Sequence, residues 1–398
     1  MKPIAIAVTL LLSLSAAASN DLTGTVLDAA SKPVPRAHVY VYTASPKTGV
    51  SAFCPSCYRD CGKHDDVDAK GAFNIADLDR TLVFDVLAVA DGYEPAFARH
   101  VDPSQGPATI HLTPRVSGGD ERLITGVVID PDGKPVVGAI VEPSGFTTTH
   151  LPDGRTLPRF VTIYGQVPGV DKLSITDANG AFALRIPDPD GELDVRVTAR
   201  SFAPRIDRGF RPGQRRTIRL IDGATITGRV TRDGKPVEGA RVTFVQKNRA
   251  SSGFLGRFEI GTSEDGLFVM TNLAPNETYV IATATDTVRG VAQPKLLTVD
   301  GDGASCDAGT FAIVRGRRVA GTLVVPEGTP VPAKMRITLT SEPSGDAQEA
   351  EVRADGTFAF EAVPDGPTRL IVPGKRGARI DLPEHGDVTG VKLDLDRP

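Results

Sequence analysis

The sequence predicts an all-β protein made of four tandem antiparallel β-sandwich domains. Three observations predict it. The 398 residues include 41 glycines and 31 prolines, which long helices tolerate poorly because Gly costs backbone entropy and Pro removes a hydrogen-bond donor. A motif of a glycine-containing strand and a Pro-Val turn recurs four times. Between the turns, apolar and polar residues alternate with period two, as in half-buried strands. No later stretch has sustained helical periodicity, so we expect no substantial helix after the N-terminal segment.

Residues 1–18 have the pattern of a secretory signal peptide. Lys2 precedes an almost purely apolar run over 4–14, and small residues follow up to Ala18, an arrangement typical of a cleaved export signal. The run is shorter than the ~20 residues of a membrane-spanning helix. We therefore expect cleavage near Ala18, a secreted or periplasmic location and no transmembrane segment in the mature chain. A buried N-terminal helix is the alternative.

Four repeats account for the rest of the chain. Each opens with a strand that carries a marker glycine, namely Gly24, Gly126, Gly228 and Gly321. Each later has a turn with Asp and Gly before a strand that carries a marker phenylalanine, namely Phe73, Phe182, Phe268 and Phe358. About seven short strands per ~100 residues are typical of a β-sandwich. The predicted domains are 19–114, 122–221, 224–314 and 316–398. Their short connections favour a semi-rigid row, with a compact cluster as the alternative.

The repeat motif resembles that of a known family. The pattern Gly-x-Val-x-Asp-x-x-Gly-x-Pro-Val-x-Gly-Ala-x-Val, followed by Thr-Asp-x-x-Gly-x-Phe, is similar to the carboxypeptidase regulatory-like domain. Residues 124–182 match best, and the fourth repeat is the most diverged because Pro332-Ala333 replaces Gly-Ala. The resemblance covers nearly all of residues 21–395. It implies a transthyretin-like or immunoglobulin-like sandwich, grouped with carbohydrate-binding-like folds, and implies little about function.

The first repeat contains an insertion with three of the four cysteines. Cys54, Cys57, Cys61 and His64 follow the spacing C-x2-C-x3-C-x2-H, which could complete a tetrahedral zinc shell from one loop. In an exported protein, disulfide formation competes with metal binding. We favour disulfides within the loop, or between a loop cysteine and Cys306 of the third repeat if the two domains touch. Zinc is the less favoured alternative and otherwise we expect no cofactor; a free or redox-active thiol is a third possibility.

The second repeat contains an insertion over 144–172. Its polar and aromatic side chains include Thr148, His150, Phe160 and Tyr164. They could form a binding surface, or the aromatic rings could pack on their own domain.

The end of the second repeat is basic. The arginines that could form an anion-binding surface are Arg205, Arg208, Arg211, Arg215, Arg216 and Arg219. Strand alternation would place Arg215, Thr217 and Arg219 on one face. Such a surface could hold phosphate or carboxylate groups of an anionic envelope polymer. The alternative is a solvated strand face balanced by acids from neighbouring domains.

The motifs give no support for an enzyme. The peptidase half of the family would need a His-x-x-Glu pair, and the related ring-cleaving dioxygenases need His-x-His; neither occurs here. The net charge of −4 argues against nucleic-acid binding. We therefore expect a non-enzymatic, exported protein that binds cell-envelope polysaccharide or serves as a scaffold. A spacer that contacts an envelope protein, and a metal or thiol-redox protein centred on the cysteine loop, are the alternatives.

Overall fold

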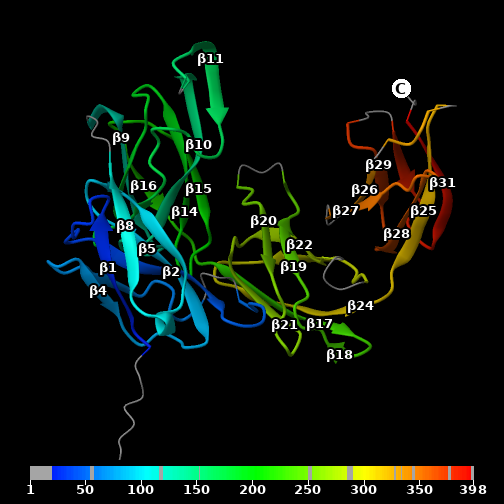
Figure 1. The fold of residues 1–398 in the computed structure, drawn as a ribbon, viewed down its shortest axis with the longest axis horizontal. Helices are drawn as coiled ribbons and strands as arrows, with labels where there is room; N and C mark the ends of the chain where they lie inside the picture. The colour runs from blue at the N-terminus through cyan, green and yellow to red at the C-terminus, as the bar shows by residue number, and fades with distance from the viewer. Residues whose placement is uncertain are drawn as a thin grey trace, which may run out of the picture.

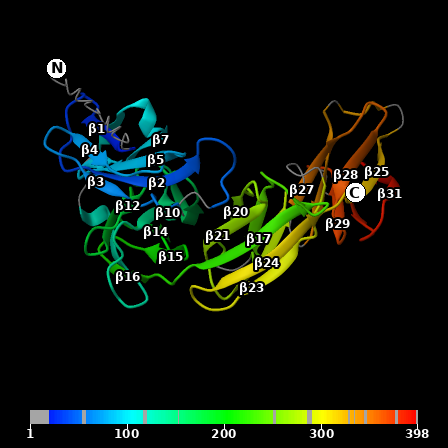
Figure 2. The same ribbon diagram turned by 90° about the horizontal axis from the view of Figure 1, so that it is seen from below.

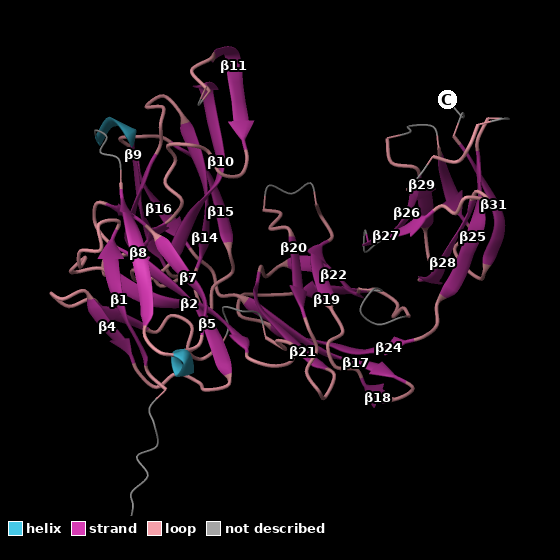
Figure 3. Cartoon of the chain, viewed as in Figure 1, coloured by secondary structure: helices cyan, strands magenta, loops and turns pink. Residues whose placement is uncertain are grey.

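The computed structural model describes residues 20–395 apart from 54–57, 116–119, 152, 250–252, 285–289, 327–328, 333, 343–345 and 375–377. The predicted signal peptide at 1–18, Cys54 and Cys57 therefore lie outside the described residues. Within them, regular structure consists of β-strands and two short 3-10 helices, η1 (Pro103–Gln105) and η2 (Asp120–Arg122). Figure 3 shows the predominance of strands. The predicted all-β fold of tandem sandwiches is confirmed.

The first two domains each consist of two facing sheets. The strands of the first domain are β1 (Leu22–Asp28), β2 (His38–Pro46), β3 (His64–Asp66), β4 (Ala72–Ile75), β5 (Leu82–Val89), β6 (Tyr93–Glu94), β7 (Ala96–Val101) and β8 (Ala108–Pro114). They form sheets in the orders β4-β1-β8-β6 and β3-β2-β5-β7. The strands of the second domain are β9 (Leu123–Ile129), β10 (Ile140–His150), β11 (Thr156–Ile163), β12 (Ser174–Ile175), β13 (Ala181–Arg185), β14 (Glu192–Thr198), β15 (Arg205–Phe210) and β16 (Arg215–Arg219). Their orders are β13-β9-β16 and β11-β10-β14-β15, with β12 beside β10.

The last two domains repeat this plan. The strands of the third domain are β17 (Ala224–Arg232), β18 (Lys235–Pro236), β19 (Val242–Gln246), β20 (Arg257–Ile260), β21 (Leu267–Leu273), β22 (Glu277–Thr283), β23 (Lys295–Val299) and β24 (Ser305–Ile313). They pair as β18-β17-β21, with β24 also on β17, and as β20-β19-β22-β23. The strands of the fourth domain are β25 (Arg317–Val324), β26 (Arg336–Ser341), β27 (Asp346–Glu351), β28 (Thr357–Val363), β29 (Thr368–Ile371), β30 (Arg379–Leu382) and β31 (Val388–Asp394). They pair as β28-β25-β31 and β27-β26-β29-β30.

One strand pair in each domain differs from the antiparallel prediction. The first and last strands of every repeat lie side by side and run parallel, in the pairs β1–β8, β9–β16, β17–β24 and β25–β31. A parallel pair needs a long crossover connection, and here the rest of the domain provides it. Turn residues indicate only that consecutive strands pair antiparallel. They do not predict that the first and last strands of a repeat pair in parallel.

The Asp-x-x-Gly turn of the repeat has a direct structural cause. In the second domain the Asp177 carboxylate accepts the backbone N–H groups of Asn179 and Ala181, both at 2.8 Å. Gly180 has φ +71°, a conformation that favours glycine. The turn delivers the chain into β13, where Phe182 points into the core and is 4% exposed.

Four separate hydrophobic cores hold the domains together. Each core draws its buried residues from a single repeat, within 22–112, 124–220, 224–313 and 319–393 respectively. Apolar side chains on the inward faces of the two sheets fill each core, as the period-two alternation predicts.

The domains form neither a simple row nor one cluster. Figures 1 and 2 show the first and second domains side by side, the third next to both, and the fourth beyond the third. The fourth domain follows the third through the short linker after Val314, a residue that exchanges backbone hydrogen bonds of 2.9 and 2.8 Å with Val291 within the third domain. No helix among the described residues is long and apolar enough to cross a membrane.

Candidate binding pocket at the junction of three domains

A short segment of the first domain docks on the third domain. We call residues 49–53 the clip. The carbonyl of Ser51 accepts the N–H of Gly261 at 3.2 Å, and the carbonyl of Ala52 accepts the N–H of Val269 at 3.0 Å. Gly261 directly follows β20 and Val269 lies in β21, so the clip bonds to the edge of each sheet of the third domain. Unpaired edges invite association with other chains, and the clip covers this one.

The side chain of Val50 explains why Gly261 is a glycine. A Cβ atom at Gly261 would lie 3.0 Å from the Cβ of Val50, which is closer than ordinary packing allows. Val50, Gly239 and Gly261 belong to a shallow hollow where the clip meets the third domain. The two domains therefore touch through backbone pairing and close packing.

Arg200 joins the second domain to the first. Its Nη1 donates to the backbone carbonyls of Arg59 at 3.1 Å and Cys61 at 3.0 Å. Elsewhere on the same interface Arg115 pairs with Asp171 at 3.1 Å. The guanidinium of Arg200 thus ends at the backbone of the cysteine-containing insertion, which fixes that loop against the second domain.

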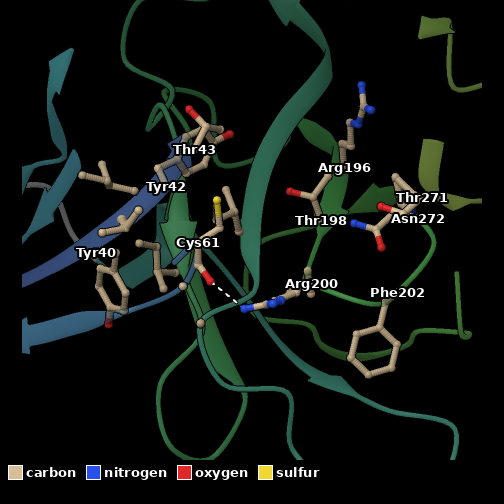
Figure 4. Close-up of a pocket in the computed structure, with 18 of the residues that line it drawn as sticks. Tyr40, Tyr42, Thr43, Cys61, Arg196, Thr198, Arg200, Phe202, Thr271 and Asn272 are labelled. Atoms are coloured by element: carbon tan, nitrogen blue, oxygen red, sulfur yellow. Dashed lines mark hydrogen bonds between the residues drawn. The ribbon is translucent and has the colours of Figure 1, made fainter. Parts of the chain in front are cut away.

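A pocket of about 360 Å³ lies where the three domains meet. Its size falls within the roughly 300–1,000 Å³ typical of ligand sites. The lining residues that Figure 4 labels are Tyr40, Tyr42, Thr43 and Cys61 of the first domain, Arg196, Thr198, Arg200 and Phe202 of the second, and Thr271 and Asn272 of the third. Phe258 and Met270 add apolar surface from the third domain. The pocket is mainly apolar, with hydrogen-bonding groups at several points of its wall.

Burial and neighbouring charges shift the pKa of Tyr42 in the pocket and of Glu142 beside it. Burial raises the pKa of Tyr42 to about 12, and the nearby carboxylate of Glu142 adds to this rise. Glu142 lies opposite Arg196 in the β10–β14 pair; burial raises the pKa of Glu142, while the positive charge of Arg196 acts in the opposite direction. Tyr42 therefore keeps its proton at neutral pH and can donate a hydrogen bond to a ligand.

Arg196 has an unused donor at this site. Its Nε is buried and has no hydrogen-bond partner within the part of the chain that the structure describes. A buried donor without a partner costs free energy. The arrangement is suited to binding a molecule with apolar faces and hydroxyl groups.

Two of the four predicted zinc ligands, Cys61 and His64, lie among the described residues. Cys61 is buried in the first core, and burial raises the pKa of its thiol to about 11. His64 is exposed on β3, with its ring centroid 5.4 Å from that of Tyr40. Cys61 and His64 both line one shallow hollow. The described residues contain no group of three potential metal ligands, and because Cys54 and Cys57 lie outside them, the zinc site stays a prediction.

Cys306 does not form the disulfide between domains that we considered. It lies half-buried against the core of the third domain and is not disulfide-bonded. The contact between the first and third domains that such a disulfide would require nevertheless exists. Backbone hydrogen bonds of the clip make it, rather than a disulfide. Disulfides within the loop stay a prediction.

Most of the arginine stretch is paired within its own domain. The ion pairs are Arg205–Asp207, Arg208–Asp194, Arg211–Glu192 and Arg216–Asp207. Arg219 donates to the carbonyls of Asp130 and Pro131 at 3.1 and 2.8 Å. The acidic partners belong to the second domain itself, whereas the hypothesis of a solvated strand face placed them in neighbouring domains. Arg215 is exposed and lines a cleft between the first two domains.

The insertion of the second repeat forms a protruding hairpin of β10 and β11 (Figure 1). At its base Phe146 is 1% exposed, whereas Phe160 and Tyr164 are 59% and 71% exposed. The buried carboxylate of Asp188 anchors the end of β10, because it accepts from Thr148 at 2.5 Å and lies 3.0 Å from Nδ1 of His150. The ring at the base packs on its own domain, whereas the rings of the outer strand are exposed, and a binding role for them stays a prediction.

Several residues of the pocket carry no sequence signal. Tyr42, Arg196 and Asn272 belong to no motif, and they meet only because three domains come together. Alternation along β2 predicts from the sequence that Tyr40 and Tyr42 point outward. The sequence does not predict which surface they face.

The comparisons with known proteins leave the family open. No family model matches the chain, and no curated protein is significantly similar to it. The solved structures that it resembles include the Bacillus anthracis TIE protein, at 11% identity and a TM-score of 0.20, over 91% of this chain and 69% of that one. They also include a streptococcal ancillary pilin, at 11% identity and 0.22 over 68% and 98%, and the major pilin subunit BcpA of Bacillus cereus, at 10% and 0.18 over 69% and 98%. TM-scores this low support no conclusion about this chain, and the resemblance to the carboxypeptidase regulatory-like domain stays a prediction.

Proposed function

We propose that this chain is an exported, non-enzymatic scaffold that binds cell-envelope polysaccharide. The observation that supports it best is the three-domain pocket, whose wall combines Tyr40, Tyr42 and Phe202 with the donors Arg196 and Asn272. Sugar rings present apolar faces that pack on aromatic rings and hydroxyls that need hydrogen-bonding partners. A mainly apolar pocket with a few placed polar groups suits such a ligand.

The contacts between the domains support binding by a preorganised site. The clip fixes the first domain to the third, and Arg200 fixes the second to the first. Walls that are already in place reduce the ordering cost of binding. In this proposal the repeats serve as rigid blocks that hold the pocket open.

The polar groups of the pocket support binding rather than catalysis. Tyr42 keeps its proton because burial raises its pKa to about 12. The thiol of Cys61 also keeps its proton at neutral pH, since burial raises its pKa to about 11. Protonated groups of this kind donate hydrogen bonds and are poor nucleophiles. Export to the cell surface or periplasm remains part of the proposal and rests on residues 1–18.

Binding to defined polysaccharides tests the proposal. We would measure the affinity of the purified mature protein for a panel of neutral and acidic bacterial polysaccharides by calorimetry. The Tyr42→Phe variant removes the pocket hydroxyl, and Tyr164→Phe, at the exposed hairpin, is the matched control. We expect Tyr42→Phe to weaken binding about tenfold and Tyr164→Phe to leave it unchanged. Absence of binding to every member of the panel, or an equal effect of both variants, would contradict the proposal.

A structural spacer is the second candidate. The fourth domain extends from the third at the linker (Figure 2), a position from which it can reach a partner without disturbing the pocket. An envelope protein that binds residues 316–398, together with no polysaccharide binding, would favour this candidate over the first.

A further inference from the structure

A second hollow separates the outward faces of the first two domains. It has a volume of about 890 Å³ and is distinct from the three-domain pocket, although Tyr40 lines both. On the first domain its wall comes from β2 and β3, and on the second from β9, β13 and β16. We call it the interdomain cleft.

Three rings lie next to one another on the wall formed by the first domain. Tyr40 has its ring centroid 6.4 Å from that of His38 and 5.4 Å from that of His64. Strand pairing sets this spacing, because Tyr40 lies opposite His64 and His38 opposite Asp66. Alternation along β2 keeps His38 and Tyr40 facing out, since the neighbouring Val39 and Val41 are buried.

Small side chains make up the facing sheet of the second domain. Thr125 lies between Ala183 on one side and Arg215 on the other in the β13-β9-β16 register, and all three line the cleft together with Ala181. These small side chains leave space in the cleft, and the charged side chain of Arg215 also lines it.

The charges of the cleft leave two arginines available. Asp66 is engaged by His38, whose Nδ1 lies 2.5 Å away, and Asp177 is engaged in its own turn. Arg36 and Arg215 are exposed and have no carboxylate partner within the described part of the chain. Asp91 and Arg115 also line the cleft, and Arg115 pairs with Asp171 at 3.1 Å. Three arginines and three aspartates therefore line the cleft, and Arg36 and Arg215 are the two arginines that hold no carboxylate among the described residues.

We propose that the interdomain cleft binds an acidic polysaccharide, with a sugar ring against Tyr40 and with carboxylates at Arg36 and Arg215. This inference rests on the proposed function and specifies its ligand class and site. Aromatic rings pack on the apolar face of a sugar, and the planar guanidinium of arginine matches a carboxylate in two parallel hydrogen bonds. An aromatic ring and two arginine side chains line the same cleft.

An alginate oligosaccharide is the probe that tests the cleft. We expect the full-length mature protein to bind it, and the double variant Arg36→Gln/Arg215→Gln to bind it at least tenfold more weakly. The control Arg80→Gln/Arg232→Gln removes the same charge from exposed arginines outside the cleft and should keep the affinity within about twofold. Equal losses in the two double variants would overturn the proposal, because overall charge would then account for the binding.

Two further measurements separate stacking from simple charge attraction. His64→Ala removes one of the three rings without changing an arginine, and we expect it to weaken alginate binding at least threefold. Inorganic polyphosphate, an anion without sugar rings, should bind at least tenfold more weakly than alginate. Polyphosphate binding as tight as that of alginate would overturn the proposal. If a neutral polysaccharide binds in a Tyr42-dependent way and alginate does not bind, the cleft proposal fails while the proposed function stands.

Discussion

Gly126 lies directly opposite Phe182 on the neighbouring strand, and a Cβ atom at Gly126 would come 2.5 Å from the phenylalanine ring. The ring occupies the space that a side chain would need. The same pairing joins marker glycine and marker phenylalanine in the other domains, as Gly24–Phe73, Gly228–Phe268 and Gly321–Phe358. The recurring sequence signature therefore corresponds to one contact that each sandwich repeats.

Replacing this glycine should destabilise one domain. We expect Gly126→Val to lower the free energy of unfolding of the second domain by about 1–3 kcal/mol, because the added side chain overpacks the contact with Phe182. Valine favours strands, so backbone preference cannot account for a loss. Urea unfolding would measure it. In the double variant Gly126→Val/Phe182→Leu the smaller side chain makes room, and the combined loss should be less than the sum of the single losses. Strict additivity would contradict this explanation.

The glycine and phenylalanine markers also show what the sequence can predict. The pairing of Gly126 with Phe182 and the turn at Asp177 depend on residues within one repeat, and their chemistry recurs four times. Period-two alternation is a local signal as well, and it correctly places Thr217 and Arg219 outward while Ile218 is buried. Such short-range signals predict the strands, the turns and the number of domains.

The clip and the pocket depend on a different kind of information. Val50 to Phe53 have no distinctive pattern, and their partners Gly261 and Val269 lie more than two hundred residues further along. This contact depends on the complementary shapes of two folded surfaces. No local pattern in the sequence predicts it. The same reason applies to Arg200, whose partners are backbone carbonyls of another domain.

Displacing the clip should loosen the third domain at defined amides. Gly261→Leu places a side chain where Val50 now lies, so we expect the clip to leave the edge strands. The amide of Val269, which donates to Ala52, should then exchange with solvent at least tenfold faster. The amide of Val230 donates to Gly266 within the third domain at 2.8 Å and should stay protected. Faster exchange at both amides would mean that the third domain had unfolded and the clip had not simply moved.

The thiol of Cys61 should react only at high pH. Burial raises its pKa from 9.0 to about 11, so about one thiol in a thousand is ionised at pH 8. We would follow alkylation of Cys61 by mass spectrometry in the Cys54→Ser/Cys57→Ser variant, which removes the other thiols of the loop. The rate should keep rising between pH 9 and pH 11. A plateau near pH 9 would show an unperturbed thiol.

The same pKa shift affects stability. Between pH 9 and 11 the folded first domain retains a proton that the unfolded chain has lost, so stability falls as the pH rises through this window. The loss attributable to Cys61 should reach about 2–3 kcal/mol by pH 11. Comparison of the Cys54→Ser/Cys57→Ser variant with one that also carries Cys61→Ala separates this contribution from other groups that titrate at high pH.

The fourth domain should be dispensable for the stability of the other three. It has its own core and follows the third domain through a short linker, so deletion of residues 316–398 should shift the melting temperature of the remaining domains by no more than about 2 °C. Deletion of 224–398 also removes the surface on which the clip docks, and it uncovers Phe202 and Val50. We expect that shorter protein to melt lower and to associate through the exposed apolar surface. Scanning calorimetry and light scattering would measure both effects. A large drop after removal of the fourth domain alone would show that it supports the three-domain unit directly.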